Sequence, residues 1–254
     1  MTQSTVRERA LVAGLVLFFA AGAFPVLRPL AVQDLVGCYP HVTSDSFDWI
    51  RNGLFWAGED VVPSYRPPGL PWIIAVLYRA KALPLLPYLN FAALAACAAL
   101  LYRFVRARYG AGASALAVLV FGTNDFVLDH TKYVMVEIYG ALAILLAAFF
   151  YFRSGEDERA YVPFGLSLGL GFLFHYVTLP AGVGFAAAVL LTRRPHLRRL
   201  WLWLGLAVAA VPPAGWLLFR SWAYRHAPPG VLLVHIIEPL FGLQRDNIGF
   251  YAVA

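Results

Sequence analysis

Long apolar runs, separated by short polar segments, make up most of this chain. A helix that crosses a membrane needs roughly 20 mainly apolar residues, whereas a run of roughly 10–14 is more typical of an interfacial helix. The pattern therefore predicts an all-α integral membrane protein with about seven transmembrane helices. Pro163 and Pro180 are the only residues that mark helix boundaries in this region, so the division between the fifth span and the sixth rests on them. The predicted spans cover about residues 10–31, 86–104, 111–127, 133–152, 161–176, 177–192 and 198–219.

One apolar run, residues 68–78, is too short to cross a membrane, and Arg79 and Lys81 follow it directly. We expect this run to form a helix that lies on the membrane surface. Pro67 and Pro68 suit the start of such a helix, because proline is tolerated in a first helical turn.

The basic residues favour this surface placement of residues 68–78. With it, every short arginine-rich loop falls on one side of the membrane, which is the cytoplasmic side under the positive-inside rule. If residues 68–78 crossed the membrane, the loop around Arg103 would lie on the opposite side. The loops carry Arg7 and Arg9; Arg103, Arg106 and Arg108; Arg153 and Arg159; and Arg193, Arg194, Arg198 and Arg199.

The extracytoplasmic face then receives the longest polar segment, a first external loop of residues 32–85. The same face carries residues 124–132, the turn at residues 175–178 and everything after Arg220. Hydrophobic helices that only pack in lipid do not require such a loop, whereas an enzyme that works at the bilayer surface does. We therefore expect the functional site on this face.

The composition agrees with a membrane protein and argues against other classes. Of the 254 residues, 61% are hydrophobic and 13% are charged, against roughly 25% charged residues in an average soluble domain. The net charge of +6 lies in short clusters between apolar runs, which argues against a nucleic-acid partner. Cys38 lies in the external loop and Cys97 in an apolar run, so neither a disulfide framework nor a thiolate metal site is predicted.

No soluble domain, internal repeat or low-complexity segment is evident in the sequence. We therefore expect residues 1–220 to form one transmembrane module that includes the external loop, and residues 221–254 to form an external C-terminal segment. The chain stops on IGFYAVA after the polar turn LQRDN, and this ending is typical of the first residues of another helix. The pattern predicts that the chain is part of a longer protein.

Asp45 and Asp48 are the first candidates for chemistry. A helix that begins at Ser44 or Asp45 and runs to about Ala57 places both aspartates and Trp49 on one face. A carboxylate held against apolar walls has a raised pKa, and it can remove a proton from a hydroxyl or an amine. The alternative is that both aspartates only solvate the loop or cap the helix.

Glu137 is the second candidate, because it lies inside the otherwise apolar run YVMVEIYGALAILL. An ionisable residue within a span is costly and is by default a functional-site hypothesis. Its place near the outer end of the span allows it to face the same cavity as the first external loop. The alternative is an interfacial glutamate that reaches the headgroups or hydrogen-bonds a neighbouring helix.

The remaining candidates are polar residues on the same face. Cationic side chains there suit a phosphate-bearing lipid, since arginine engages phosphate in a fork geometry. For each cation the alternative is contact with bulk headgroups, and for His175 it is a purely structural role. The cationic candidates are Arg51, Arg66, Lys132, Arg220 and Arg225, and the other polar candidates are Asp125, Asp129, His130, His175 and Tyr176.

Other reaction classes have no motif in this chain. A glycine-rich phosphate loop after a strand, an HExxH helix and a GxSxG elbow are absent from the sequence. Asp45-x-x-Asp48 has oxygen ligands that suit a divalent cation, but no further ligands cluster with it. Neither a metal nor a cofactor is therefore predicted.

Three segments occur in a fixed order along the chain. The external loop contains Asp45-Ser46-x-x-Trp49, then Gly58, then Arg66-Pro67-Pro68-Gly69-Leu70-Pro71 before the short apolar helix. Val134-Met135-Val136-Glu137 enters a later span, and Phe164-Gly165-Leu166-x-Leu168-Gly169-Leu170-Gly171 lies in the next. In this order and on one face, they resemble the GT-C-fold glycosyltransferases of the protein O-mannosyltransferase and aminoarabinose-transferase type. The resemblance covers roughly residues 10–220, and it rests on the order of short motifs.

The resemblance implies inverting transfer of a sugar from a polyprenyl-phosphate sugar to an extracytoplasmic glycan, lipid or protein, in a bacterial inner membrane. It implies no nucleotide cofactor, and membrane lipid as a partner. Asp45 would be the base, although the sequence by itself does not separate it from Asp48, and Glu137 is a further catalytic candidate. The candidate substrate-binding residues, taken from their residue types and their place on this face, are Arg51, Arg66, Asp129, His130, Lys132, His175 and Tyr176.

Two other functions compete with this hypothesis. One is a non-catalytic binder of lipid-linked sugars or a transporter subunit, and the other is an inactive fragment of a longer transferase. An enzyme requires Asp45 and Glu137 to face one cleft that opens to the lipid. A transporter would carry acidic residues at the middle of several spans, and this chain has few of them.

Overall fold

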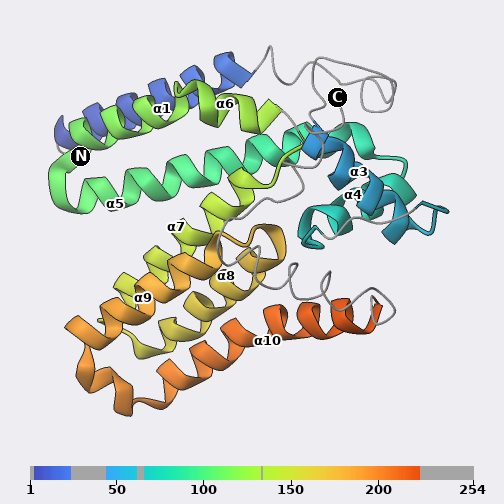
Figure 1. Ribbon diagram of the computed structural model, residues 1–254. Helices are drawn as coiled ribbons and strands as arrows, with labels where there is room; N and C mark the ends of the chain where they lie inside the picture. Colours follow the sequence, from blue (N-terminus) through green and yellow to red (C-terminus); the bar gives the residue numbers. More distant parts are fainter. Residues whose placement is uncertain (1–2, 24–43, 62–65, 133, 224–254) are drawn as a thin grey trace, which may run out of the picture.

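The computed structural model describes residues 3–23, 44–61, 66–132 and 134–223, and the regular structure in this part of the chain is helical throughout (Figure 1). The all-α prediction is therefore confirmed for these residues. The α-helices are α1 (Gln3–Ala23), α3 (Ser44–Ala57), α4 (Gly69–Arg79), α5 (Leu86–Gly122), α6 (Asp125–Lys132), α7 (Glu137–Arg153), α8 (Tyr161–Phe174), α9 (Thr178–Thr192) and α10 (Leu200–Ala223). The short 3-10 helices are η1 (Leu83–Leu85), η2 (Glu158–Ala160) and η3 (Arg194–Arg198).

Every apolar run predicted as a span coincides with a described helix, with shifts at the ends. Two of the runs form α5, which Gly110 divides into two arms that run back along each other (Figure 1). Gly110 has φ 81° and ψ 178°, a backbone conformation that glycine adopts without the penalty other residues meet. The division between α8 and α9 is also confirmed, whereas residues 24–31 of the first predicted span lie outside the described residues.

Residues 125–132, at the junction of the third and fourth predicted spans, form the helix α6, which the sequence pattern did not predict. Asn124 caps it: the backbone N–H of Val127 donates to Asn124 Oδ1 at 3.2 Å. Asp125 in the first turn complements the positive end of the helix dipole. The preceding helix accordingly ends at Gly122, earlier than predicted.

Among the residues that the structure describes, two segments are long and apolar enough to cross a membrane. They are Leu83–Gly122, which includes both arms of α5, and Leu200–Arg220 in α10. The helices α4 and α9 are apolar but shorter. A topology with about seven crossings therefore stays a prediction.

Large apolar side chains lie on the outer surface of these helices. Among them are Leu116 of α5, Leu191 of α9 and Leu218 of α10, which are 63%, 74% and 72% exposed. Extended apolar surface of this kind is unfavourable in water and is typical of helices that contact lipid. The surface therefore supports the membrane class that the composition indicates.

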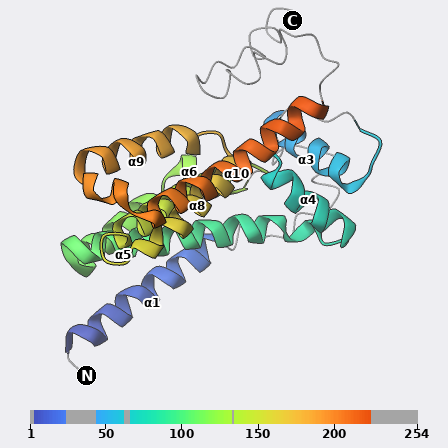
Figure 2. The same ribbon diagram turned by 90° about the horizontal axis from the view of Figure 1, so that it is seen from below.

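The helices α7, α8, α9 and α10 pack together as a bundle (Figures 1 and 2). The closest contact joins α8 to α10 through glycines. A Cβ atom at Gly165 would collide with the carbonyl of Gly205, and one at Gly205 would collide with the carbonyl of Tyr161. Small residues at such crossings allow helix backbones to approach closely, which explains the glycine-punctuated sequence of α8.

The helices α3 and α4 form a pair beside one end of this bundle (Figure 1). Trp49 of α3 joins Leu70 and Ile74 of α4 in one buried cluster. Gly53 makes this contact possible, because a Cβ atom there would collide with the side chain of Ile74. The helix expected at residues 68–78 is thus confirmed as α4, and its placement on a membrane surface stays a prediction.

The end of α3 is fixed by a glycine and by α4. Gly58 has φ 95°, and its N–H donates to the Phe55 carbonyl at 3.0 Å. Arg79 at the end of α4 donates to the carbonyls of Ala57 and Trp56 at 3.2 Å and 3.1 Å. These bonds satisfy carbonyls that the last helical turn leaves without a partner.

Arginines join several helices at the opposite end of the molecule. Arg106 of α5 donates to Glu8 of α1 at 2.6 Å. The guanidinium of Arg108 lies 4.8 Å from the ring centre of Phe152 near the end of α7. The start of α1, the Gly110 turn and the end of α7 therefore lie together.

The two later arginine-rich turns lie at the same end. Arg193 donates to Ser154 Oγ at 2.8 Å, which joins the turn after α9 to the end of α7. Arg199 and Glu158 form an ion pair at 3.2 Å, which joins the residue after η3 to η2. The predicted gathering of the four basic clusters is therefore confirmed as a gathering at one end of the helices, and its assignment to the cytoplasm stays a prediction.

The α8–α10 contact predicts a matched pair of glycine substitutions. Gly165→Ala should lower the free energy of unfolding by about 1–3 kcal/mol, because the new methyl group forces the helices apart. Gly184→Ala in α9 should be neutral or stabilise by up to about 1 kcal/mol, since nothing lies within 4 Å of a Cβ at that position. Thermal unfolding of the two variants in detergent measures this difference in stability. Equal changes in the thermal midpoint of the two variants would contradict the prediction.

Candidate functional site

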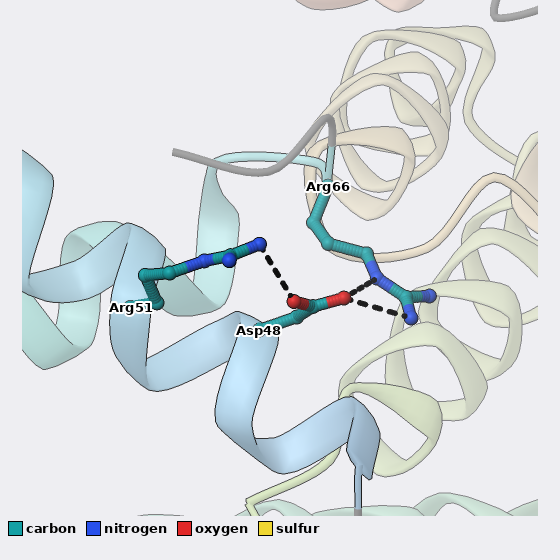
Figure 3. A network of polar contacts seen from close by, with 3 residues as sticks. All are labelled: Asp48, Arg51 and Arg66. Atoms are coloured by element: carbon teal, nitrogen blue, oxygen red, sulfur yellow. Dashed lines mark hydrogen bonds and ion pairs between the residues drawn. The ribbon is translucent and has the colours of Figure 1, made fainter. Parts of the chain in front are cut away.

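Asp48 and Arg66 meet at the junction of α3 with the segment that leads into α4. Arg66 Nε and Nη2 both lie 3.4 Å from Asp48 Oδ2, and Arg51 Nη2 lies 3.0 Å from Asp48 Oδ1 (Figure 3). The guanidinium of Arg66 also lies 5.3 Å from the ring centre of Trp49. Asp48 thus lies between two guanidinium groups, unlike the apolar surroundings that the sequence predicted for it.

Partial exposure limits what these ion pairs contribute to stability. The side chains of Asp48, Arg51 and Arg66 are 32%, 42% and 29% exposed. Ion pairs in such surroundings typically contribute about 0–1 kcal/mol. Their main effect is orientation, because Asp48 and the Trp49 ring together hold the Arg66 guanidinium in one place.

The backbone around Arg66 is fixed by its contact with the end of α8. Pro67 and Pro68 are buried, and Gly69 begins α4. A Cβ atom at Gly69 would lie only 2.7 Å from the carbonyl oxygen of Leu173 and 2.9 Å from the Phe174 ring. Only glycine allows this approach, which places Arg66 beside the turn that follows α8.

Glu137 is the first residue of α7, where the positive end of the helix dipole favours a carboxylate. The preceding residues Val134 and Val136 are buried in the same cluster as Trp49, so α7 starts against the α3–α4 pair. Glu137 Oε2 is buried and has no hydrogen-bond partner within the described residues. Buried polar atoms without a partner are rare in folded proteins, so this oxygen is a candidate for binding a substrate group.

A buried polar network fixes the start of α7. Asn90 of α5 donates to the Thr131 carbonyl at 3.2 Å and accepts from Tyr139 Oη at 2.6 Å. The Tyr139 ring stacks on Phe174 at the end of α8, with 5.0 Å between ring centres. This network therefore holds Glu137, two residues before Tyr139, close to the turn after α8.

His175 lies in that turn and faces Glu137 and Arg66. Its Nδ1 accepts the Val177 N–H at 3.0 Å, so the neutral ring carries its proton on Nε2. Burial lowers the pKa of His175, the charge of Glu137 opposes this shift, and the charge of Arg66 adds to it. Gly140 makes room for the residue, because a Cβ atom there would lie 3.1 Å from His175 Cβ.

Tyr176 connects the site to α10. Its hydroxyl accepts from Trp216 Nε1 at 3.3 Å. Burial raises the pKa of Tyr176, whereas the charge of Arg220, the bond from Trp216 and the charge of Arg66 act in the opposite direction. Arg220 is only 6% exposed, so two guanidinium groups approach Tyr176 from segments far apart in the sequence.

The structure brings together the predicted residues Asp48, Arg51, Arg66, Glu137, His175, Tyr176 and Arg220. Asp45 is the second residue of α3, but its side chain lies outside the described part of the chain. The side chains of Asp129, His130 and Lys132 also lie outside it, as do the whole residues Cys38 and Arg225. Asp125 is exposed at the start of α6. No three His, Cys, Asp or Glu side chains gather as metal ligands among the described residues.

Three residues that position the site were missed from the sequence. Asn90 and Trp216 lie inside apolar runs, and Gly140 lies one turn after Glu137. The only signal for Asn90 was an amide within a predicted span, which is a costly residue there. Nothing in the sequence distinguished Trp216 from an interfacial tryptophan, or Gly140 from a packing glycine.

Comparison with known families adds an independent observation. The sequence profile of the dolichyl-phosphate-mannose-protein mannosyltransferases matches residues 65–219, more than half of the chain. The chain belongs to this family. The resemblance to GT-C-fold glycosyltransferases is thereby confirmed, and with it the membrane class of the protein. The matched segment begins one residue before Arg66 and includes Glu137, His175 and Tyr176, whereas Asp45 and Asp48 precede it.

One curated relative is an uncharacterized protein of Aquifex aeolicus (strain VF5). It is 23% identical over 229 residues, which cover 81% of this chain and 46% of the relative. The chain thus spans about half the length of the curated relative that it matches. No solved structure matches the chain.

The partly buried, neutral imidazole of His175 should make the stability of the protein depend on pH. The unfolded chain binds a proton at His175 below roughly pH 6.5, whereas the folded protein resists this proton because the pKa of His175 is lowered there. The free energy of unfolding should therefore fall as the pH drops below roughly 6.5. The His175→Gln variant lacks this titrating group. When the pH is lowered from about 7.5 to about 5.5, the thermal midpoint of the variant should therefore fall less than that of the wild type.

His196→Gln is the control for this measurement. His196 bonds Tyr161 at the opposite, arginine-rich end of the molecule, so the variant should keep the acid sensitivity that His175 causes. Equal acid sensitivity in the wild type and His175→Gln would contradict the prediction.

Proposed function

We propose that the protein is a GT-C glycosyltransferase that moves a sugar from a polyprenyl-phosphate sugar to an acceptor outside the cytoplasm, with inversion at the anomeric carbon. The observation that carries this proposal is the position of Arg66. Arg66 is the second residue of the segment matched by the mannosyltransferase family, and it lies among Asp48, His175 and Tyr176. A bacterial inner membrane is the proposed location, and the acceptor is a glycan, a lipid or a protein.

Arg66 is the proposed ligand of the donor phosphate. The donor carries one negative charge on its phosphodiester, and the leaving polyprenyl phosphate gains a second when the bond to the sugar breaks. A fixed guanidinium stabilises the second charge most in the transition state, where that charge develops. The Asp48 contact and the Trp49 ring support this role because they orient Arg66 before the donor binds.

Arg220 is a second proposed contact for the phosphate. It is buried, and its charge reaches Tyr176 from α10 while that of Arg66 reaches the same tyrosine from the first external loop. The three guanidinium groups of Arg51, Arg66 and Arg220 outnumber the two carboxylates of Asp48 and Glu137. This balance favours an anionic group near Tyr176.

The transfer step needs a base for the acceptor. We infer that the Asp45 carboxylate takes the proton of the attacking hydroxyl or amine, whose lone pair then forms the new bond to the anomeric carbon. The bond between this carbon and the phosphate oxygen breaks, and its electron pair stays on the leaving phosphate. Asp48 is less suited to this role, because both of its oxygens already accept bonds from arginines. Glu137 remains a further candidate for contact with the reacting groups.

Substitution of Arg66 tests the proposed phosphate ligand. Arg66→Gln should reduce sugar transfer by about 10²–10³-fold, the usual effect of removing one group that stabilises developing charge. Arg66→Lys should recover part of the activity, because lysine keeps the charge but loses the fork geometry and the stacking on Trp49. The measurement is transfer from radiolabelled polyprenyl-phosphate mannose to acceptors in membranes that contain the full chain.

Arg199→Gln is the matched control, since Arg199 pairs with Glu158 at the opposite end of the helices. This variant should transfer sugar at the wild-type rate. If Arg66→Gln also retained full transfer, Arg66 would not be the phosphate ligand.

A comparison of the two aspartates tests the proposed base. Asp45→Asn should lower the transfer rate by about 10²–10⁴-fold without weakening donor binding, because the proton acceptor is lost. Asp48→Asn should instead weaken donor binding, because Arg66 loses the carboxylate that orients it. Both quantities are measured with the radiolabelled donor, and the folded state is checked by thermal unfolding.

The opposite pattern, with transfer lost only in Asp48→Asn, would assign the base to Asp48. Binding of the donor by the wild type without any transfer would favour the alternative functions, a binder or an inactive part of a longer transferase.

A further inference from the structure

Two side chains of the site carry complementary hydrogen-bonding groups that do not bond to each other. Glu137 Oε2 is a buried acceptor without a partner within the described residues. His175 uses Nδ1 to accept the Val177 N–H, so the neutral ring keeps a donor, the Nε2–H, that can reach a different group. The site therefore presents one acceptor and one donor.

The fold holds these two groups on the same side of the site. Gly140 lies three residues after Glu137 and hence on the same face of α7. The His175 side chain packs against Gly140, where a Cβ atom would lie 3.1 Å from His175 Cβ. Glu137 and His175 are close enough for the charge of one to act on the other, yet no hydrogen bond joins them in the described structure. A third group that both donates and accepts can bridge them.

A hydroxyl group has this property. Its O–H donates to the Glu137 carboxylate, and its oxygen accepts from His175 Nε2–H. A protonated amine also donates to Glu137, but it cannot accept a hydrogen bond, so it leaves the His175 donor without a partner, and the nearby charge of Arg66 offsets its attraction to Glu137. A carboxylate would meet the negative charge of Glu137. The chemistry of the pair therefore selects a hydroxyl.

We propose that Glu137 and His175 together bind one hydroxyl of the transferred sugar and make the protein selective for a hydroxyl over an amine at that position. This inference rests on the proposed function, which places the donor phosphate at Arg66. The sugar is bonded directly to that phosphate, so its ring hydroxyls lie within a few ångströms of the phosphate. Arg66 and Glu137 both face His175, and this arrangement puts the pair beside the sugar.

Binding of donor analogues to the purified full chain tests the proposal. Radiolabelled polyprenyl-phosphate mannose is displaced by analogues in which one ring hydroxyl at a time is replaced by hydrogen or by an amine. The wild type should bind one deoxy analogue about tenfold or more weakly than the parent donor, which corresponds to one hydrogen bond with a charged partner. The amino analogue at the same position should also bind more weakly than the parent.

Two substitutions connect this selectivity to the pair. In Glu137→Ala and in His175→Phe, the parent donor should bind about tenfold more weakly while the sensitive deoxy analogue binds as before, so their ratio falls close to one. Phenylalanine keeps a ring against Gly140 but has no N–H. Glu137→Gln replaces the alanine variant if thermal unfolding shows that the latter does not fold.

His196→Phe is the matched control. His196 also uses Nδ1 in a hydrogen bond, at 2.9 Å from Tyr161 Oη, but at the opposite end of the molecule. The ratio between parent donor and deoxy analogue should be unchanged in this variant.

Three results would overturn the inference: equal binding of all deoxy analogues by the wild type, a ratio that persists in both site variants, or tighter binding of the amino analogue than of the parent. If transfer falls in the variants while every analogue binds alike, the hydroxyl belongs to the acceptor and the assignment to the sugar is wrong. If the wild type does not bind polyprenyl-phosphate mannose at all, the proposed function itself fails, and the inference fails with it.

Discussion

The arrangement of the site depends on one close contact, between the first residue of α4 and the end of α8. Gly69 lies so near the Leu173 carbonyl and the Phe174 ring that any side chain there would collide with them. The two buried prolines before it stiffen the chain on the other side. The Arg-Pro-Pro-Gly sequence therefore places Arg66 beside the turn that holds His175. Without the close contact at Gly69, Arg66 would not lie beside the turn that holds His175.

Uncharged groups complete the arrangement around Glu137. In a protein surrounded by lipid, buried polar groups must find partners inside the protein, because no water is present to replace them. Asn90 does this for the Thr131 carbonyl and for Tyr139, and so ties α5, α6 and α7 at one point. Gly140 then leaves the space that His175 occupies. The carboxylate is placed by groups that take no part in the chemistry.

The two ends of the molecule use arginine in different ways. At the end that gathers the basic clusters, Arg106 and Arg199 pair with glutamates, and Arg193 bonds a serine hydroxyl and a backbone carbonyl. These bonds tie helix ends together. At the other end, Arg66 and Arg220 both act on Tyr176, and Arg66 acts on His175 together with Glu137, whose Oε2 has no partner in the described structure. The basic end thus has contacts that stabilise the fold, and the other end has an arrangement suited to a ligand.

The sequence by itself determined the apolar helical segments, the gathering of the basic clusters at one end and the residue types of the site, because hydrophobic length, proline and charge act locally along the chain. It also indicated the family, through the order of its motifs. Only the tertiary structure decided that Asp48 is held by two arginines, that His175 is a neutral donor, and that Asn90 and Gly140 place Glu137. Each of these depends on contacts between residues far apart in the sequence, and no local pattern records such distances. The short polar helix α6 has no long apolar run to reveal it, and it was not predicted; in the structure Asn124 caps its first turn.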